Sequence, residues 1–180
     1  MEHKGSSRWE GEVRLYVYSL KQDDPKKCTA AKLCRFWMAK AIRQASRLPP
    51  GAILLDPTSK NVLLPSDRER VARRGVVAVD CSWKKVDQVF SHRFRGRDRR
   101  LPLLLPANPV SYGKASRLSS LEALSAALFI CGFNAQAERL LTPFKWSSTF
   151  LTLNRNLLEE YSSAVSRDDV VAVECSYFSG

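Results

Sequence analysis

The sequence contains only two histidines, and one of them, His3, lies near the N-terminus in a stretch that we expect to be frayed. A zinc site, or a serine or cysteine nucleophile activated by histidine, would therefore rest on His92 alone, which argues against both. The chain also lacks a Walker-type phosphate-binding loop and a GxGxxG element. Nucleotide hydrolysis and a dinucleotide cofactor thus lose support.

Long hydrophobic runs are missing as well. No stretch of about 18 residues is free of charged side chains, and the opening MEHKGSSRWEGE has no hydrophobic signal region. We therefore expect an unsecreted, cytoplasmic protein that does not bind membranes. The five cysteines form no CxxC pair, and an odd number is unlike a disulfide framework, so we interpret them as reduced thiols.

Positive charge is abundant and unevenly distributed. The 29 lysines and arginines exceed the 18 acids, and the segment RFRGRDRR (93–100) holds five arginines against one aspartate. Because arginine and lysine neutralise phosphates and release counterions, this clustering predicts binding to RNA or DNA. The alternative is a solvated loop in a basic protein.

The first half of the chain alternates predicted strands with predicted helices. Apolar runs predict strands at 13–20, 52–56, 76–80 and 101–105. Helical periodicity and end signals predict helices at 30–46, at 66–75 and from Ser82 onward. This alternation indicates an α/β fold with a largely parallel sheet.

The character of the sequence changes near residue 113. Helices are predicted at 119–132, 134–142, 148–163 and 167–177, and the first begins with a capping box formed by Ser119 and Glu122. The loop at 106–118 is either a linker or a turn that cradles a ligand. The sequence therefore predicts an α/β half followed by an all-helical half.

Ligands of open parallel sheets bind beyond the carboxyl ends of the strands, which makes the loops 23–29, 80–83 and 106–118 candidates here. Thr29 opens the helix after the first loop, and Ser120 opens the helix after the third. In each case the hydroxyl either holds an anionic group such as a carboxylate or only caps its helix.

The second loop has the sequence DCSW, and three of its side chains each allow more than one interpretation. Cys81 is either a reactive thiol or a packed core residue, and the scarcity of histidine favours packing. Asp80 is a general base or a partner in a cap or salt bridge. Trp83 is either core or the wall of a cofactor pocket, and spacing alone does not choose between them.

Six motifs, in order, carry a resemblance to a known family. They are DPKKCT with KL at 32–33, LPPGAILLDP (48–57), VDCSW (79–83), RLPLLLPANPVSYG (100–113), LSSLEALSAAL (118–128) and FKWSSTFLTLNRNLLEEY (144–161). From about residue 13 to 177 the chain resembles the small-subunit ribosomal RNA aminocarboxypropyltransferases of archaea and eukaryotes. The resemblance implies a flexible tail at 1–12, a knotted SPOUT-like α/β domain at 13–113 and an all-helical domain at 114–180.

The resemblance also implies S-adenosylmethionine as cosubstrate, and no metal. Such enzymes transfer its 3-amino-3-carboxypropyl group to ring nitrogen 3 of a pseudouridine, commonly N1-methylated, and release methylthioadenosine. Thr29 and Ser120 would hold the carboxylate of the cosubstrate. Trp83 and Val86 would bury its methyl group, so that the RNA base reaches only the γ-carbon of the propyl chain. Backbone contacts to the ribose and adenine would fall on Val79, Leu101 and Ser116.

On the same reading, Asp80 is a candidate base for the ring proton. The partner is small-subunit ribosomal RNA, and its track would comprise Lys26, Lys27, Arg93, Arg95, Arg97, Arg99 and Arg100. We expect a monomer, because the helical half would cover the surface through which many knotted relatives dimerise. Two alternatives stay open, a catalytically silent RNA-binding assembly factor and a SPOUT-type RNA methyltransferase.

Overall fold

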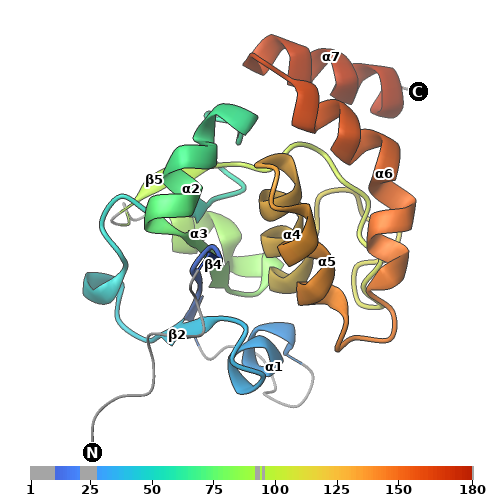
Figure 1. Ribbon diagram of the computed structural model, residues 1–180. Helices are drawn as coiled ribbons and strands as arrows, with labels where there is room; N and C mark the ends of the chain where they lie inside the picture. Colours follow the sequence, from blue (N-terminus) through green and yellow to red (C-terminus); the bar gives the residue numbers. More distant parts are fainter. Residues whose placement is uncertain (1–10, 21–27, 92–93, 95, 180) are drawn as a thin grey trace, which may run out of the picture.

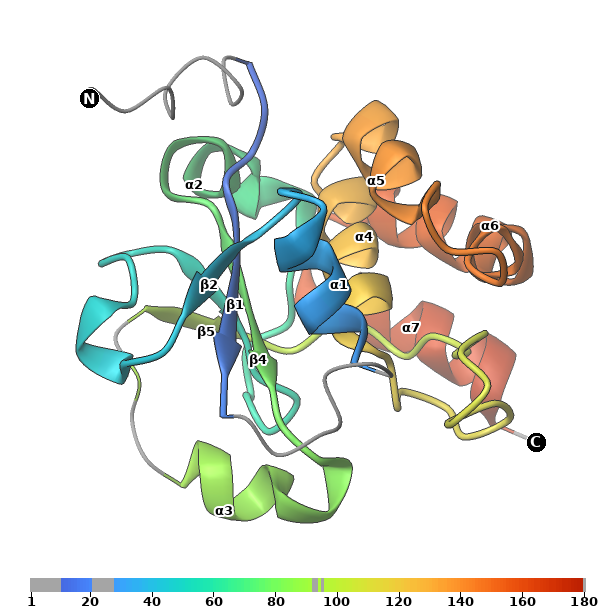
Figure 2. The same cartoon turned by 90° about the horizontal axis from the view of Figure 1, so that it is seen from below.

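A five-stranded parallel sheet forms the centre of the computed structural model, which describes residues 11–20, 28–91, 94 and 96–179 (Figures 1 and 2). Its strands are β1 (Leu15–Ser19), β2 (Lys40–Ile42), β3 (Ile53–Leu55), β4 (Val76–Asp80) and β5 (Arg97–Arg99). They lie in the order β2-β1-β4-β3-β5, and every neighbouring pair is parallel. The predicted α/β class with a largely parallel sheet is confirmed.

Most helices lie on one side of this sheet. In Figure 2, α1 and α4 stand beside the strands, α5, α6 and α7 lie beyond them, and α3 lies past the carboxyl ends. The bounds are α1 (Thr29–Arg35), α2 (Arg68–Arg74), α3 (Val86–Phe90), α4 (Ser120–Ile130), α5 (Asn134–Leu141), α6 (Ser148–Ser163) and α7 (Arg167–Phe178). Short 3-10 turns span Ala45–Arg47, Pro65–Asp67 and Trp83–Lys85. Within the described residues, no helix combines the length and apolar character needed to cross a bilayer.

The predicted helix at 30–46 is wrong beyond Arg35. There α1 ends, Trp37 takes a left-handed backbone conformation with φ of 59°, and residues 40–42 form β2 beside β1. Only Ile42 of the three β2 residues is buried, so this strand has no apolar alternation by which to recognise it. Pairing with the edge of β1 overrides the helical periodicity of the local sequence.

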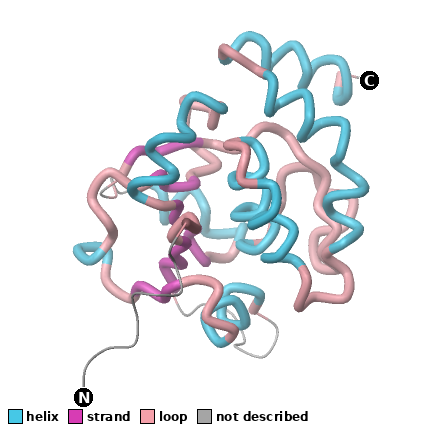
Figure 3. Tube along the Cα trace, viewed as in Figure 1, coloured by secondary structure: helices cyan, strands magenta, loops and turns pink. Residues whose placement is uncertain are grey.

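The predicted strand at 101–105 is also wrong, and the strand in this region is β5. Figure 3 shows the chain between β5 and α4 as continuous loop. A side chain takes the place of a neighbouring strand, because Asn154 of α6 accepts a hydrogen bond from the amide of Leu105 and donates one to its carbonyl, both at 2.8 Å. An apolar run has the sequence pattern of a strand whether its backbone hydrogen bonds are made by a neighbouring strand or by side chains.

Two further side chains of the helical half hold the start of this loop. Glu174 of α7 accepts from the amide of Leu103 at 3.0 Å and pairs with Arg100 at 2.7 Å. The hydroxyl of Tyr161 donates to the carbonyl of Leu103 at 3.0 Å. The segment 100–105 is therefore fixed by side chains of α6 and α7.

One continuous core joins the two halves of the chain. Its fully buried members include Leu15 of β1, Leu33 of α1, Leu124 of α4 and Phe150 of α6. A smaller buried cluster, which includes Tyr18 and Leu54, covers the opposite face of the sheet. The boundary predicted at residue 113 thus coincides with no break in the core, and the division into two domains stays a prediction.

Candidate functional site

A cavity of about 750 Å³ lies where β3 and β4 end. Its wall combines the start of α1, residues 55–57 at the end of β3, the end of β4 with the turn and α3 after it, the segment 100–103, the loop that leads into α4 with the first turn of that helix, and Trp146. All seven residues expected to bind the cosubstrate line this cavity: Thr29, Val79, Trp83, Val86, Leu101, Ser116 and Ser120. Asp80 and Cys81 line it as well.

The cap of α1 is Cys28 rather than Thr29. The Cys28 Sγ accepts a hydrogen bond from the amide of Ala31 at 3.4 Å, while Thr29 is the first residue of the helix and lines the cavity. The alternative in which Thr29 serves as the helix cap is therefore wrong. Its hydroxyl remains available as a candidate for ligand binding.

Asp80 lies next to the thiol of that cap. The Cys28 Sγ donates to Asp80 Oδ2 at 3.3 Å. Burial, with the nearby Asp80 charge, raises the pKa of Cys28 to about 11 and also raises the pKa of Cys34. Both thiols are thus protonated near neutral pH, unlike reactive thiolates. Both histidines, His3 and His92, lie outside the described residues.

Trp83 joins the sheet side of the cavity to the helical side. Its indole Nε1 donates to the carbonyl oxygen of Leu118, just before α4, at 3.2 Å. Val86 and Phe90, one and two turns further along, line the same cavity. The ring is thereby held in one orientation as part of an apolar wall, in line with the pocket-wall reading of this residue.

Ser116 presents an unpaired polar atom. Its Oγ is buried and has no hydrogen-bond partner, and it is the only such side-chain oxygen or nitrogen among the described residues. Its own amide donates to the carbonyl of Leu104 at 2.8 Å, and its φ of 64° is left-handed. Since buried hydroxyls are normally paired, an unpaired one in a cavity wall fits a ligand that supplies the missing partner.

Glu122 organises the loop that forms one side of the cavity. Its Oε1 accepts from the amides of Ala107 and Asn108 at 2.7 and 3.0 Å, and its Oε2 accepts from the Asn108 side chain at 2.7 Å. Oε2 also accepts from the amide of Ser119 at 2.7 Å, which confirms the predicted capping box. The sequence indicated that box but gave no signal that the same carboxylate holds residues 107–108.

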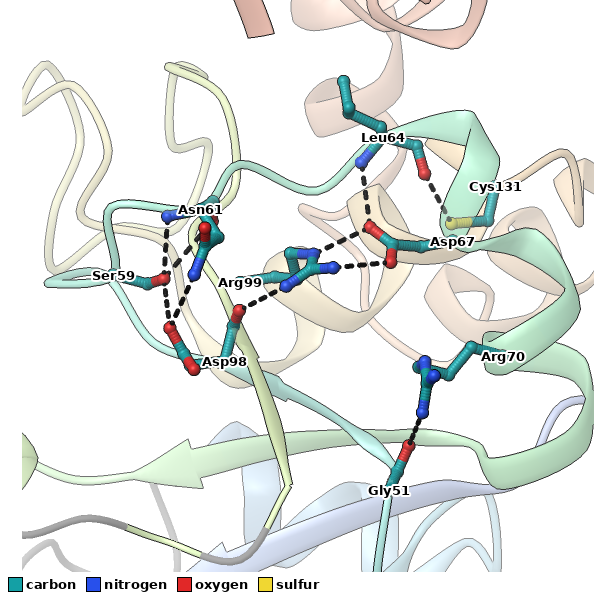
Figure 4. Close-up of polar contacts among 9 residues, drawn as sticks. All are labelled: Gly51, Ser59, Asn61, Leu64, Asp67, Arg70, Asp98, Arg99 and Cys131. Atoms are coloured by element: carbon teal, nitrogen blue, oxygen red, sulfur yellow. Dashed lines mark hydrogen bonds and ion pairs between the residues drawn. The ribbon is translucent and has the colours of Figure 1, made fainter. Parts of the chain in front are cut away.

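The predicted arginine track is only partly free. Arg99 forms a two-bond ion pair with Asp67 at 2.9 and 3.0 Å (Figure 4), and Arg100 is paired with Glu174. Both side chains of the first pair are largely buried. These ion pairs hold the edge of the sheet. Arg99 and Arg100 are therefore not freely available to bind RNA.

Of the other predicted RNA contacts, Arg97 lies within the described residues, where it is exposed on β5. The remaining predicted RNA contacts, Lys26, Lys27, Arg93 and Arg95, lie outside the described residues. Basic residues that the sequence reasoning missed are Lys32, which lines the cavity, and the exposed Lys84 and Lys85 directly after Trp83.

The family described as "Ribosome biogenesis protein, C-terminal" matches residues 53–178. A second family, "Possible Fer4-like domain in RNase L inhibitor", matches residues 13–47. That stretch contains two cysteines, Cys28 and Cys34, whereas an iron–sulfur cluster usually takes four thiolates. In the part of the chain that is described, no three histidine, cysteine or acidic side chains gather as a metal-binding group. The residues present do not fit a cluster.

Similar proteins extend over nearly the whole chain. The 16S rRNA aminocarboxypropyltransferase of Methanosarcina mazei is 42% identical over 92% of this chain and 95% of its own. The protein of the same name from Vulcanisaeta distributa is 46% identical over 83% and 82%. The solved structure of the SAM-dependent rRNA:acp-transferase Tsr3 from Vulcanisaeta distributa superposes with a TM-score of 0.81 at 38% identity, covering 93% of this chain and 99% of that one. The chain belongs to the 16S rRNA aminocarboxypropyltransferase family.

Proposed function

We propose that this protein transfers the 3-amino-3-carboxypropyl group of S-adenosylmethionine to ring nitrogen 3 of a pseudouridine, commonly N1-methylated, in small-subunit ribosomal RNA. Methylthioadenosine is released, and the step belongs to maturation of the small subunit. The observation that carries the proposal is that seven residues from separate segments line a single cavity. Membership of the family supports the same reaction.

The cavity has the size and chemistry that the cosubstrate requires. Its volume of about 750 Å³ lies within the usual range for ligand pockets. The unpaired hydroxyl of Ser116 offers a polar contact, and the hydroxyls of Thr29 and Ser120 are candidates for the carboxylate. Trp83 and Val86 supply an apolar surface for the methyl group.

The reaction needs little help from side chains beyond positioning. A bond forms between the ring nitrogen and the γ-carbon of the propyl chain, the carbon–sulfur bond breaks, and sulfur keeps the electron pair as a neutral thioether. Because the apolar wall covers the methyl carbon, the propyl γ-carbon is the one that an RNA base reaches. Asp80, which accepts a hydrogen bond from the Cys28 thiol, is the candidate acceptor for the proton of the ring nitrogen.

The RNA partner is recognised first through its phosphates. Lys32 at the cavity, Lys84 and Lys85 after Trp83, and Arg97 on β5 are the described basic residues that we assign to it. The predicted Lys26, Lys27, Arg93 and Arg95 complete the proposed track. We expect the protein to act as a monomer in the cytoplasm, without a membrane.

Two finer features of the fold belong to this proposal. We infer that residues 13–113 form a SPOUT-like domain with a trefoil knot and that residues 114–180 form a helical domain. Arg100 exchanges backbone hydrogen bonds with Asn61 and Leu63, so the chain after β5 runs beside the connection after β3. An experimental structure whose ends can be drawn apart without a knot would refute the proposed knot. Proteolysis that frees a folded 114–180 fragment would support the division.

The decisive experiment uses S-adenosylmethionine labelled separately on its carboxyl and methyl carbons, incubated with the protein and small-subunit RNA. Carboxyl label alone in the RNA is the expected result. Methyl label in the RNA would favour the methyltransferase alternative and contradict the proposal. RNA binding with no transfer of either label would favour the catalytically silent assembly factor.

A further inference from the structure

The turn after α1 exposes a tryptophan in a strained backbone conformation. Trp37 is 73% exposed, and its φ of 59° is left-handed. Its amide donates to the carbonyl of Cys34 at 3.1 Å, and the next amide, of Met38, donates to Leu33 at 3.0 Å. Glycine is usual at such a helix end, because a β-carbon is strained there. An exposed indole at a strained position points to a binding role.

Other aromatic side chains connect this tryptophan with the cavity. Phe36 is 42% exposed, and its ring contacts that of Phe144 edge to face with centroids 6.4 Å apart. Phe144 contacts Trp146 in the same way at 6.2 Å, and Trp146 lines the cavity. We call these four residues, Phe36, Trp37, Phe144 and Trp146, the aromatic strip. It leads from the proposed reaction site to the exposed turn.

The chain segment that carries Phe36 and Trp37 holds charges of one sign. Between Asp24 and Asp56 the sequence holds seven lysines and arginines and no acid. The Arg35 guanidinium lies over the Phe36 ring at 5.3 Å from its centroid, and Lys32 on the same helix lines the cavity. Exposed rings interleaved with cations are typical of surfaces that bind single-stranded nucleic acid. A partner of mixed charge would leave this excess of positive charge without enough negative groups to pair with.

We propose that Trp37 and Phe36 stack against bases of the single-stranded ribosomal RNA that flank the modified nucleotide, while Arg35 and Lys32 meet its phosphates. This inference rests on the proposed function. A nucleotide that enters the cavity has to leave its stacked neighbours, which then expose their own faces. Aromatic side chains next to the cavity replace the lost stacking and hold the strand in place.

Trp37→Gly separates a role in RNA binding from a role in stability, because it should lower RNA affinity while it raises the melting temperature. Glycine relieves the left-handed strain, so the variant should melt about 2 °C higher than the parent. Its affinity for a fluorescein-labelled single-stranded oligouridine should fall about tenfold. The dependence of affinity on salt should stay unchanged, whereas Arg35→Ala should lower that slope by about 0.7.

The controls test the ring and the site separately. Trp37→Tyr should restore most of the affinity, and Tyr177→Ala, which removes a 46% exposed ring on α7, should leave it unchanged. S-adenosylmethionine affinity should be equal in all variants. Unchanged RNA affinity in Trp37→Gly would overturn the inference. The indole would then face a protein partner or a second copy of the chain, the latter visible as a concentration-dependent mass.

The proposed function can fail independently of this inference. If the parent protein transfers no propyl group but Trp37→Gly still loses oligouridine affinity, the stacking surface stands and the activity does not. If the parent transfers the group and Trp37→Gly binds and reacts as the parent does, only the stacking role is lost.

Discussion

The indole nitrogen of Trp83 donates a hydrogen bond to the carbonyl oxygen of Leu118 at 3.2 Å. Trp83 follows the end of β4, and Leu118 precedes α4, so this contact joins the sheet and the helical half across the cavity. It fixes the plane of a large apolar ring beside the candidate carboxylate site at Ser120. The selectivity of the proposed reaction depends on this wall being rigid, because a mobile ring would leave the methyl carbon accessible.

We therefore predict that Trp83→Ala weakens S-adenosylmethionine binding about 30-fold, since a buried apolar contact of about 2 kcal/mol is lost. Trp83→Phe keeps the apolar surface and loses only the hydrogen bond, so its affinity should fall about fivefold. Isothermal titration calorimetry measures both. Equal affinities of the parent and Trp83→Ala for S-adenosylmethionine would show that Trp83 does not form a wall of the cosubstrate pocket.

Glu122→Gln should disturb the cavity through the loop that the carboxylate holds. The amide nitrogen introduced by the substitution would face the donors of Ala107, Asn108 or Ser119, so we expect a loss of about 2 kcal/mol in the free energy of unfolding. The KM for S-adenosylmethionine should rise more than kcat falls. Urea unfolding and steady-state kinetics provide the two readings.

Asp169→Asn is the matched control for that substitution. Asp169 occupies the same place in the capping box of α7, where it accepts from the amides of Val165 and Ser166. It is exposed and takes no part in the cavity, so its loss should leave the KM unchanged. A rise of KM in both variants alike would mean that Glu122 acts only by capping its helix.

Arg97→Ala and Arg99→Ala should have different effects, although only Asp98 separates the two arginines. Arg99 and Asp67 are a largely buried pair, and removal of the arginine leaves the carboxylate unpaired, which should lower the free energy of unfolding by about 3 kcal/mol. Exposed Arg97 should affect stability little, but its removal should reduce the salt dependence of RNA binding by about 0.7. The reverse pattern would return Arg99 to the RNA track.

The cysteines should react in an order set by exposure and pKa. Cys175 is exposed and should be alkylated first at pH 8, while Cys28, with a pKa of about 11, has only about one thiolate in a thousand at that pH. Cys131, with a pKa of about 12, should react more slowly still. Iodoacetamide labelling followed by peptide mass mapping gives the order. Rapid alkylation of Cys28 at pH 8 would contradict it.

The raised pKa of Cys28 also sets the direction of a pH effect on stability. Folding raises this pKa from 9.0 to about 11, so the folded chain keeps a proton that the unfolded chain loses. The stabilisation is complete below pH 9 and is lost as the pH rises through 11. Cys28→Ser should flatten this part of the stability profile.

The proposed chemistry assigns no role to the half-buried thiol at 81 in the cavity wall. Cys81→Ser should therefore transfer the propyl group at close to the parental rate in the labelled-cosubstrate assay. Complete loss of transfer in a folded Cys81→Ser protein would revive the thiol as a nucleophile.

Elements whose side-chain pattern matches their burial were predictable. The apolar run at 76–80 became β4 with the predicted bounds, and α6 spans 148–163 as its periodicity indicated. The capping box of Ser119 and Glu122 also formed as expected. In these segments local preference and tertiary packing favour the same conformation, so the sequence suffices.

The failures occur where a distant group decides the conformation. β2 exists because β1 offers a free edge, although its own residues carry a helical pattern. The segment 101–105 stays extended without a strand partner because Asn154, about fifty positions away in the chain, supplies the hydrogen bonds of one. Neither partner can be read from the local residues.

The sequence alone determined the fold class, the family and seven residues that line the cavity, because buried strands and ordered motifs are local in the chain. Tertiary structure decided which of their groups remain available. Cys28 caps α1 and leaves Thr29 as a residue of the cavity wall, while Arg99 forms an ion pair with Asp67 and Arg100 forms one with Glu174. Competition for a hydrogen bond or a charge depends on which groups lie close in space, and only folding sets those distances.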